Sequence, residues 1–353
     1  MLLPRLELLI GGFVFVLLIG LGPALNLVSR RQPTRILLAC CMAPLVGLVE
    51  LGIVLYPLVY ADHPLNSIAV PAADVLLLLS AILVGVTVRT DRGVLLALIE
   101  RKRAMFVTVL LTAICAAFVL FALTLPLIVS NLEYGLWQSS PWDATNYMLT
   151  AWHAQHLLWS YGANPAHYQD LLNINPALAT IMAWFPHDRP VSAIALGWFS
   201  TVLGVPVYYA YYPYKLLSLF CSFWVTLAVC SLIGIRGWQR YMSAIVIAIG
   251  FWGVFIVDID ASSQLNAIPL SLLFLFAWLQ LELSPAQTQK IVGSFGREHV
   301  LFALSFAGLI GYYPEFIVLL SAALIGYYAF QILHRPAFWR VTLNRVLTLG
   351  AGS

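Results

Sequence analysis

The chain has 353 residues, of which 61% are hydrophobic and only 9% are charged, and its formal net charge is +3. A soluble domain carries about 25% charged residues, so most of this surface is suited to lipid rather than to water. The small net charge, without a clustered basic face, gives no reason to expect nucleic acid as a partner. The five cysteines all fall in apolar runs and predict neither a disulfide framework nor a metal site.

Ten apolar stretches are candidates for crossing a bilayer, which takes about 20 residues. In chain order they are 8–28, 36–60, 69–88, 106–129, 190–209, 212–235, 241–258, 264–282, 299–313 and 315–333. The stretch 299–313 is short and would need support from neighbouring helices. We therefore predict an all-α fold, a polytopic transmembrane helix bundle of about nine to ten spans.

The whole chain, 1–353, is predicted to form a single membrane domain without an intervening soluble domain. We divide it into an N-terminal three-span extension, 1–105, and a main bundle, 106–333, whose outer loop is 130–189. Residues 334–353 begin a further apolar stretch that stops abruptly. We interpret them as the start of a C-terminal region that is either naturally short or truncated.

Orientation follows from the Lys and Arg residues, most of which fall into five short clusters, at 30–35, 89–103, 236–240, 290–297 and 335–345. Because short cytoplasmic loops are rich in these residues, the clusters are expected inside and the loop 130–189 outside. An odd number of spans must then separate residue 189 from Arg236. We expect 190–209, which Gly204 and Pro206 interrupt, to be re-entrant or interfacial; alternatively Arg236 is external and the downstream half is inverted.

The outer loop contains a strong helix start at Ser140–Pro141–Trp142–Asp143, with a capping serine, a proline at the first position and an acid in the first turn. One side of this helix carries its polar residues, and the other carries most of its large apolar ones. The polar side comprises Asp143, Asn146, Tyr147, Thr150 and His153. We predict an amphipathic helix that lies in the plane of the membrane and does not cross it.

Asp143 has two interpretations. A carboxylate in the first turn stabilises a helix by capping and by its interaction with the helix dipole, and this alone can explain the residue. The other interpretation is catalytic. His153 and His156 are three residues apart, a spacing that occurs in metal sites, but the helical wheel separates them and no metal site is predicted here. A divalent metal is left open as a cofactor.

Further polar residues are expected on the same outer side. Asp258 and Asp260 end one apolar stretch, and Glu315 follows a short turn between two others. Each can be a solvated turn residue or, if the turns converge with the outer loop, part of one cavity. Lys215 and Arg189 are the basic residues placed nearest this face, and either could meet an anionic headgroup or phosphate.

The segment from Ser140 to Tyr147 directly follows a span and resembles the first outer loop of the C-type (GT-C) polytopic glycosyltransferases. In several bacterial members this loop opens with Trp-Asp and continues into a helix with Tyr and further aromatics, which Trp142, Asp143, Tyr147 and Trp159 match. The run 175–178, Asn-Pro-Ala-Leu, is similar to the Pro-rich segment that often follows. The sequence departs from the family at Met148, where many members have His, and in having three spans before the one that leads into the loop.

The resemblance implies a membrane glycosyltransferase that transfers a sugar from a polyprenyl-phosphate-type lipid donor to an acceptor at the outer membrane face. Asp143 would then be the catalytic base, with Tyr147 and His153 in its pocket and Lys215 or Arg189 near the donor phosphate. The expected partners are membrane lipids and a lipid-linked sugar donor, and the expected location is the bacterial inner membrane with the active face outward. The alternatives are a transporter or flippase for a lipid-linked or small polar substrate, or a non-catalytic membrane subunit of a glycan or envelope assembly with a partner membrane subunit.

Overall fold

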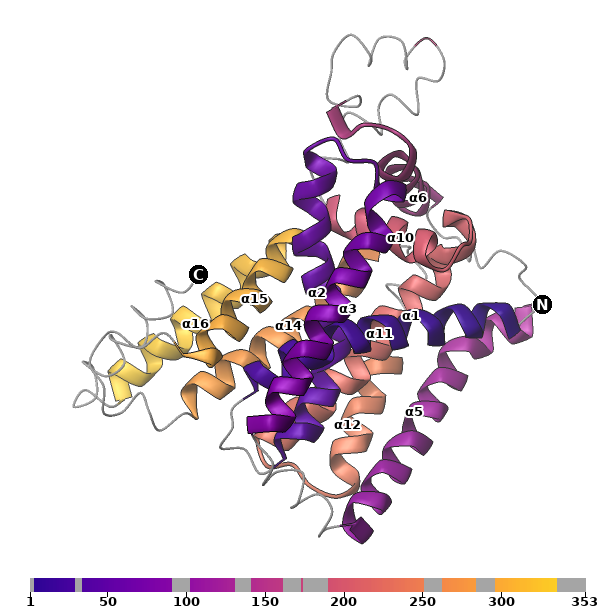
Figure 1. Cartoon of the computed structure of the whole chain (residues 1–353). Helices are drawn as coiled ribbons and strands as arrows, with labels where there is room; N and C mark the ends of the chain where they lie inside the picture. Colours follow the sequence, from indigo (N-terminus) through magenta and orange to yellow (C-terminus); the bar gives the residue numbers. More distant parts are fainter. Residues whose placement is uncertain are drawn as a thin grey trace.

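The computed structural model describes residues 3–28, 34–90, 102–130, 141–160, 173, 190–250, 262–283 and 296–334, and the elements within these ranges are helices. They are α1 (Leu3–Leu27), α2 (Arg35–Tyr60), α3 (Leu65–Thr90), α5 (Lys102–Ser130), α6 (Pro141–His156), α10 (Pro190–Val202), α11 (Val207–Leu232), α12 (Trp238–Ile249), α14 (Ser262–Glu282), α15 (Arg297–Tyr312) and α16 (Glu315–His334) (Figure 1). Seven of them are long and apolar enough to cross a membrane: α1, α2, α3, α5, α11, α14 and α16. The described part of the chain is all-helical, and its seven long apolar helices are those of an integral membrane protein.

Three of the ten predicted spans correspond, in the described residues, to helices shorter than the roughly 20 residues that cross a bilayer. The stretch 190–209 contains the 13-residue α10, 241–258 contributes to the 12-residue α12, and 299–313 corresponds to the 16-residue α15. At about 1.5 Å per residue, α10 is roughly 20 Å long, whereas the hydrocarbon core is about 30 Å thick. The α10–α11 turn contains Gly204, whose φ of 65° suits glycine, so the predicted interruption is present.

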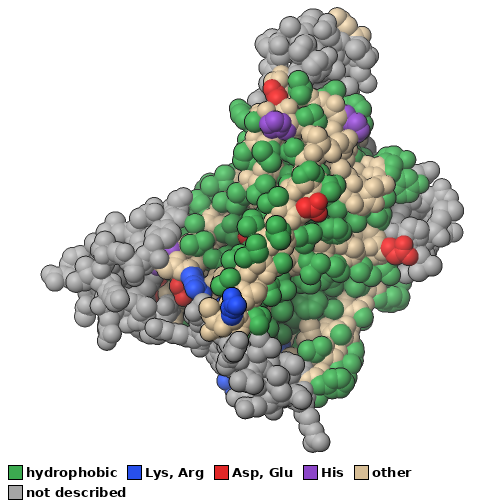
Figure 2. All heavy atoms as spheres, viewed as in Figure 1, with side chains coloured by type: hydrophobic (Ala, Val, Ile, Leu, Met, Phe, Trp, Pro, Cys, Tyr) green, Lys and Arg blue, Asp and Glu red, His purple; other side chains and the backbone are tan. Residues whose placement is uncertain are grey.

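Basic residues mark one end of the helix bundle. At this end, called the basic end below, Arg35 donates from Nε to the Leu25 carbonyl at 3.0 Å and Arg297 donates to the Asn26 carbonyl at 3.3 Å. Arg240 lies at the same end, lining a cavity with residues of the first turn of α2. On the face shown in Figure 2, the described Lys and Arg side chains lie in the lower part and histidines lie near the top.

The opposite end of the bundle is organised around the turn between α2 and α3. Asp62 in this turn accepts a hydrogen bond from the Ser160 amide at 2.6 Å, just beyond α6. Asn66, at the start of α3, accepts one from the Thr201 hydroxyl at 2.9 Å, at the end of α10. Since α11 begins five residues after α10 ends and runs to the basic end, α11 is the helix that connects the two ends in this part of the chain.

The first three helices pack closely because small residues lie where they cross. A Cβ added at Gly47 of α2 would lie 2.0 Å from the Val16 carbonyl oxygen, and one added at Gly20 of α1 would lie 2.0 Å from that of Ala43. Between α1 and α3, the Ser80 hydroxyl donates to the Leu18 carbonyl at 2.6 Å and accepts from the Gly22 amide at 2.9 Å. Small residues and interhelical hydrogen bonds of this kind hold helices together in lipid, where apolar surface alone gives little driving force.

Two long helices lie at the edge of the described bundle. Figure 1 shows α5 and α16 diverging from the central helices in different directions. Their exposed side chains are apolar: Phe106 on α5 is 67% exposed and Leu333 on α16 is 77% exposed. Hydrophobic side chains likewise cover most of the face in Figure 2, as expected for a surface that meets lipid.

Candidate functional site

Helix α6 is the predicted outer-loop helix, and it begins at Pro141 as the Ser-Pro-Trp-Asp pattern indicated. Gln155 holds this helix at the end of the bundle opposite the basic end. Its side-chain amide donates to the Gly197 carbonyl at 3.0 Å, to the Ser200 hydroxyl at 3.1 Å and to the Thr201 hydroxyl at 2.9 Å. All three partners belong to α10. This one side chain therefore fixes α6 against the buried helix α10.

The polar side of α6 is turned into the bundle. Tyr147 is 1% exposed and Thr150 and His153 are fully buried, whereas Trp152 is 45% exposed. The sequence grouped these three polar residues on one side of the helix, and they share a buried environment. Trp159, which follows the helix, is buried as well. Tyr147 and His153 were predicted to lie in a pocket with Asp143; both are buried in the described structure, where α3, α10, α11 and α14 contact α6.

Several polar atoms on this buried side of α6 have no hydrogen-bond partner among the described residues. They are Oδ1 of Asn146 and Oγ1 of Thr150. The two ring nitrogens of His153 also lack a partner in hydrogen-bonding geometry there, although the backbone of Leu158 and Trp159 lies close to the ring. A threonine in a helix commonly donates back to the carbonyl four residues earlier, as Thr112 and Thr124 do here, but Thr150 does not. Buried polar groups without partners are costly and call for an explanation, such as a bound polar ligand or an unresolved water.

His153 is held as a neutral ring. Burial lowers its pKa to about 4, and the nearby backbone of Trp159 and Leu158 opposes this shift. The ring also lies 5.9 Å from the Trp159 ring. His156, three residues later, is exposed and stacks on Trp152. The two histidines thus point into different environments, as the helical wheel indicated, and do not form a common metal site.

A buried hydrogen-bond network lies deeper in the bundle, where α10, α11 and α14 meet. The Asn266 side-chain amide donates to the Ser192 hydroxyl at 2.9 Å and to the Tyr214 hydroxyl at 3.1 Å. Its carbonyl oxygen accepts from the Ser218 hydroxyl. Tyr147 of α6 and Tyr312 of α15 each interact electrostatically with Tyr214, so the network adjoins the buried face of α6.

Lys215 follows Tyr214 on α11 and is only 1% exposed. Its ammonium lies 5.1 Å from the centre of the Tyr211 ring and 5.8 Å from that of Tyr212. Aromatic faces stabilise a desolvated cation, and a buried ammonium attracts anions strongly. Tyr214 links the Asn266 network to Tyr147 on the inner side of α6, and Lys215 is the next residue along α11.

The turn before α16 also reaches this region. Gln264, near the start of α14, donates to the Tyr313 hydroxyl at 3.2 Å. The segment that contains Tyr313 and Glu315 therefore lies beside the start of α14. In the sequence, α14 follows the predicted acidic residues Asp258 and Asp260. Glu315 itself is exposed at the first position of α16.

Several predicted site residues lie outside the described residues. Asp143 is the third residue of α6, and only the backbone of this first turn is described. Arg189, Asp258 and Asp260 lie in undescribed segments. Among the side chains that are described, no group of three or more His, Cys, Asp and Glu residues is arranged to hold a metal ion.

The network centred on Asn266 was not predicted as a site. A signal was present: an asparagine followed by Ala, Ile, Pro, Leu and further apolar residues lies inside a membrane-spanning stretch. Polar residues within such stretches usually face the bundle interior and find partners there. Ser192 carried no comparable signal.

No protein-family model, no curated protein and no solved structure matches this chain. The candidate site therefore stands on its own residues and geometry.

Proposed function

We propose that the chain is a GT-C-like membrane glycosyltransferase that takes its sugar from a polyprenyl-phosphate-type lipid donor. The observation that carries the proposal is the buried polar side of α6, which has unpartnered polar atoms at Asn146, Thr150 and His153. A ligand rich in hydroxyls, such as a sugar, can both donate to and accept from such atoms. The resemblance of the Trp142–Asp143 segment at the start of the same helix gives the second support.

The chemistry requires a base and a cation. In the proposed reaction, the Asp143 carboxylate takes the proton of an acceptor hydroxyl, and the hydroxyl oxygen bonds to the anomeric carbon of the sugar. The bond from that carbon to the lipid phosphate oxygen breaks, and its electron pair leaves with the phosphate. In this proposal Lys215, which is buried on α11 next to Tyr214, stabilises the charge on the leaving phosphate. The active face would be the opposite end of the bundle, proposed to lie outside a bacterial inner membrane.

The alternative of a transporter or flippase rests on acidic residues within spans. Glu50 is half-buried within α2 and Asp74 is exposed on α3. Both are candidates for coupling ions, since acids inside membrane spans are often functional. They give the alternative a direct test, because neither takes part in the proposed transfer.

The test is transfer from a radiolabelled polyprenyl-phosphate sugar by the purified chain in proteoliposomes, measured as release of polyprenyl phosphate. Asp143→Asn should lower turnover about 100-fold or more while polyprenyl phosphate still binds. Lys215→Met should instead weaken polyprenyl phosphate binding. Asp74→Asn is the matched control and should retain transfer.

Two results would contradict the proposal. If Asp143→Asn retains turnover, the carboxylate only stabilises the helix start, and the loss of stability should be about 1 kcal/mol. If no lipid-linked sugar supports transfer but Asp74→Asn abolishes movement of the lipid between leaflets, the transporter interpretation holds.

A further inference from the structure

A second site is formed at the basic end of the bundle, far along α11 from the candidate transfer site. A small cavity lies there between α2, α5, α11 and α12, and its polar lining comes from Thr112, Ser231, Arg240 and Tyr241. Its volume is about 10 Å³, roughly the space that one water or one phosphate oxygen needs. The remaining lining is apolar.

Arg240 is the charged residue of this cavity. Its Nη2 donates to the Tyr241 hydroxyl at 2.7 Å, and its guanidinium carbon lies 4.7 Å from the Tyr241 ring centre. Among the described residues its Nε is buried without a hydrogen-bond partner, and no acidic residue there pairs with the guanidinium. Towards these residues most of its donors are therefore available to an anion.

Tyr241 holds Arg240 in this position. The tyrosine is 6% exposed, and its hydroxyl donates to the Thr108 carbonyl at 3.4 Å and lies 3.3 Å from the Thr112 hydroxyl. Because the phenol is fixed to α5 by its own proton, it accepts from Arg240. The guanidinium is thus pre-oriented at the cavity, and binding an anion there needs little reordering of the side chain.

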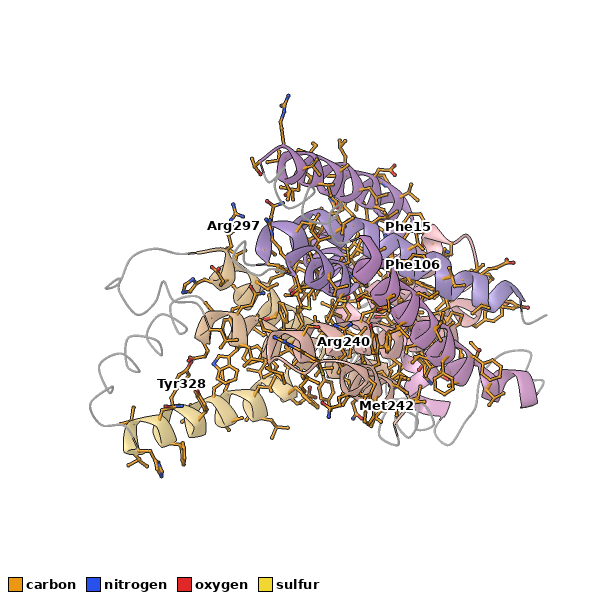
Figure 3. All side chains as sticks on the ribbon, turned by 90° about the horizontal axis from the view of Figure 1, so that it is seen from below. Phe15, Phe106, Arg240, Met242, Arg297 and Tyr328 are labelled. Carbon is orange, nitrogen blue, oxygen red and sulfur yellow. The ribbon has the colours of Figure 1, made fainter. Side chains whose placement is uncertain are left out.

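The surroundings indicate a lipid rather than a free ion. Trp238 is 72% exposed, and Met242 and Val246 follow it at four-residue intervals on the outer side of α12. These positions form an apolar stripe on the outer side of α12, on the face of the helix away from Arg240. Figure 3, which looks onto this end, shows Arg240 away from the edge where Arg297 lies, with Met242 on the same helix. Because the cavity lies between α5 and α12, whose outer side chains are apolar, a lipid at this surface can place its phosphate at Arg240 while its acyl chains pack against these helices.

We propose that Arg240 binds the phosphate of an anionic phospholipid in the leaflet at the basic end, with one phosphate oxygen entering the cavity. The start of α12 adds to this preference, since Gly237 gives it no side-chain cap and its free amides carry partial positive charge. Basic pockets between membrane helices on the cytoplasmic side commonly hold such headgroups. The site is independent of the proposed glycosyl transfer.

The test is native mass spectrometry of the full chain, released from detergent with phosphatidylglycerol or with phosphatidylcholine of the same acyl chains. The wild type should retain phosphatidylglycerol preferentially. Arg240→Gln should weaken phosphatidylglycerol binding about 10-fold, as loss of a charge-assisted contact does, and leave phosphatidylcholine binding unchanged. Arg236→Gln removes the same charge from an exposed position four residues earlier and should change binding less than about 2-fold.

Three outcomes would overturn the inference. Equal retention of the two lipids by the wild type would mean that the cavity holds only water. An equal loss in Arg236→Gln would mean that the preference reflects general charge. Displacement of phosphatidylglycerol by millimolar inorganic phosphate would identify a free phosphate as the ligand. If Arg240→Gln does not fold, Arg240→Lys keeps the charge without the planar fork and should weaken phosphatidylglycerol binding about 3-fold.

Discussion

The buried ring of His153 predicts that the folded protein loses stability when the pH falls from about 7 to about 4.5. Its pKa is about 4 in the folded chain because burial disfavours the charged ring, and about 6.5 when unfolded. Below the unfolded value, the unfolded chain binds a proton that the folded chain does not. The contribution of the neutral ring is therefore complete above about pH 6.5 and is lost progressively down to about pH 4.

The size of this effect follows from the two pKa values. Each unit of difference corresponds to about 1.4 kcal/mol, so the full shift is worth about 3 kcal/mol and most of it is lost by about pH 4.5. The assay is the free energy of unfolding in detergent micelles, from denaturant titrations at the two pH values. His153→Leu should be less stable at neutral pH because its packing is imperfect, but it should lose about 2–3 kcal/mol less than the wild type on acidification.

His156→Gln is the matched control, since His156 is exposed on the same helix. This variant should keep the pH dependence of the wild type. If wild type and His153→Leu lose the same free energy between the two pH values, His153 is not held neutral in the folded state. The account of the inner side of α6 as a desolvated polar surface would then be wrong.

Two further predictions concern the packing of the first three helices. Ser80→Ala removes the two hydrogen bonds that the Ser80 hydroxyl makes across to α1, with the Leu18 carbonyl and the Gly22 amide. It should lower the free energy of unfolding by about 1–2 kcal/mol; an unchanged denaturation midpoint would show that these bonds add nothing. Gly47→Ala places a methyl group 2.0 Å from the Val16 carbonyl oxygen and should cost about 2–3 kcal/mol by the same titration. Gly85→Ala meets no atom within 4 Å and should raise the free energy of unfolding by about 0.5–1 kcal/mol, because Ala favours the helix over Gly; equal effects at the two glycines would contradict the close crossing.

The membrane-spanning helices could be predicted because their signal is composition over a sufficient length, which needs no knowledge of their neighbours. The start of α6 was also predictable, because its signal is local: Pro141 and the capping pattern around it act within one turn. The short length of α15 was predicted from the stretch 299–313, whereas the lengths of α10 and α12 were not predictable in the same way. An apolar run shows that a segment avoids water, but it does not show whether lipid or other helices surround it.

The environment of the polar side of α6 could not be predicted for a related reason. A helical wheel shows that Tyr147, Thr150 and His153 lie on one side, but not what that side contacts. Here Gln155 fixes the helix to α10, and that long-range contact turns the polar side inward. The network around Asn266 depends in the same way on contacts between residues more than 45 positions apart.

The central claim is that the bundle binds a lipid-linked phosphate beside the inner side of α6. It is tested most directly by an electron cryo-microscopy structure of the full chain in lipid nanodiscs with polyprenyl phosphate. The account predicts a phosphate within contact distance of the Lys215 ammonium and a polyprenyl tail that leaves the bundle toward lipid, with Thr150 and His153 facing the same space. Polyprenyl phosphate found only elsewhere, with the inner side of α6 closed against α10 and α11, would contradict it.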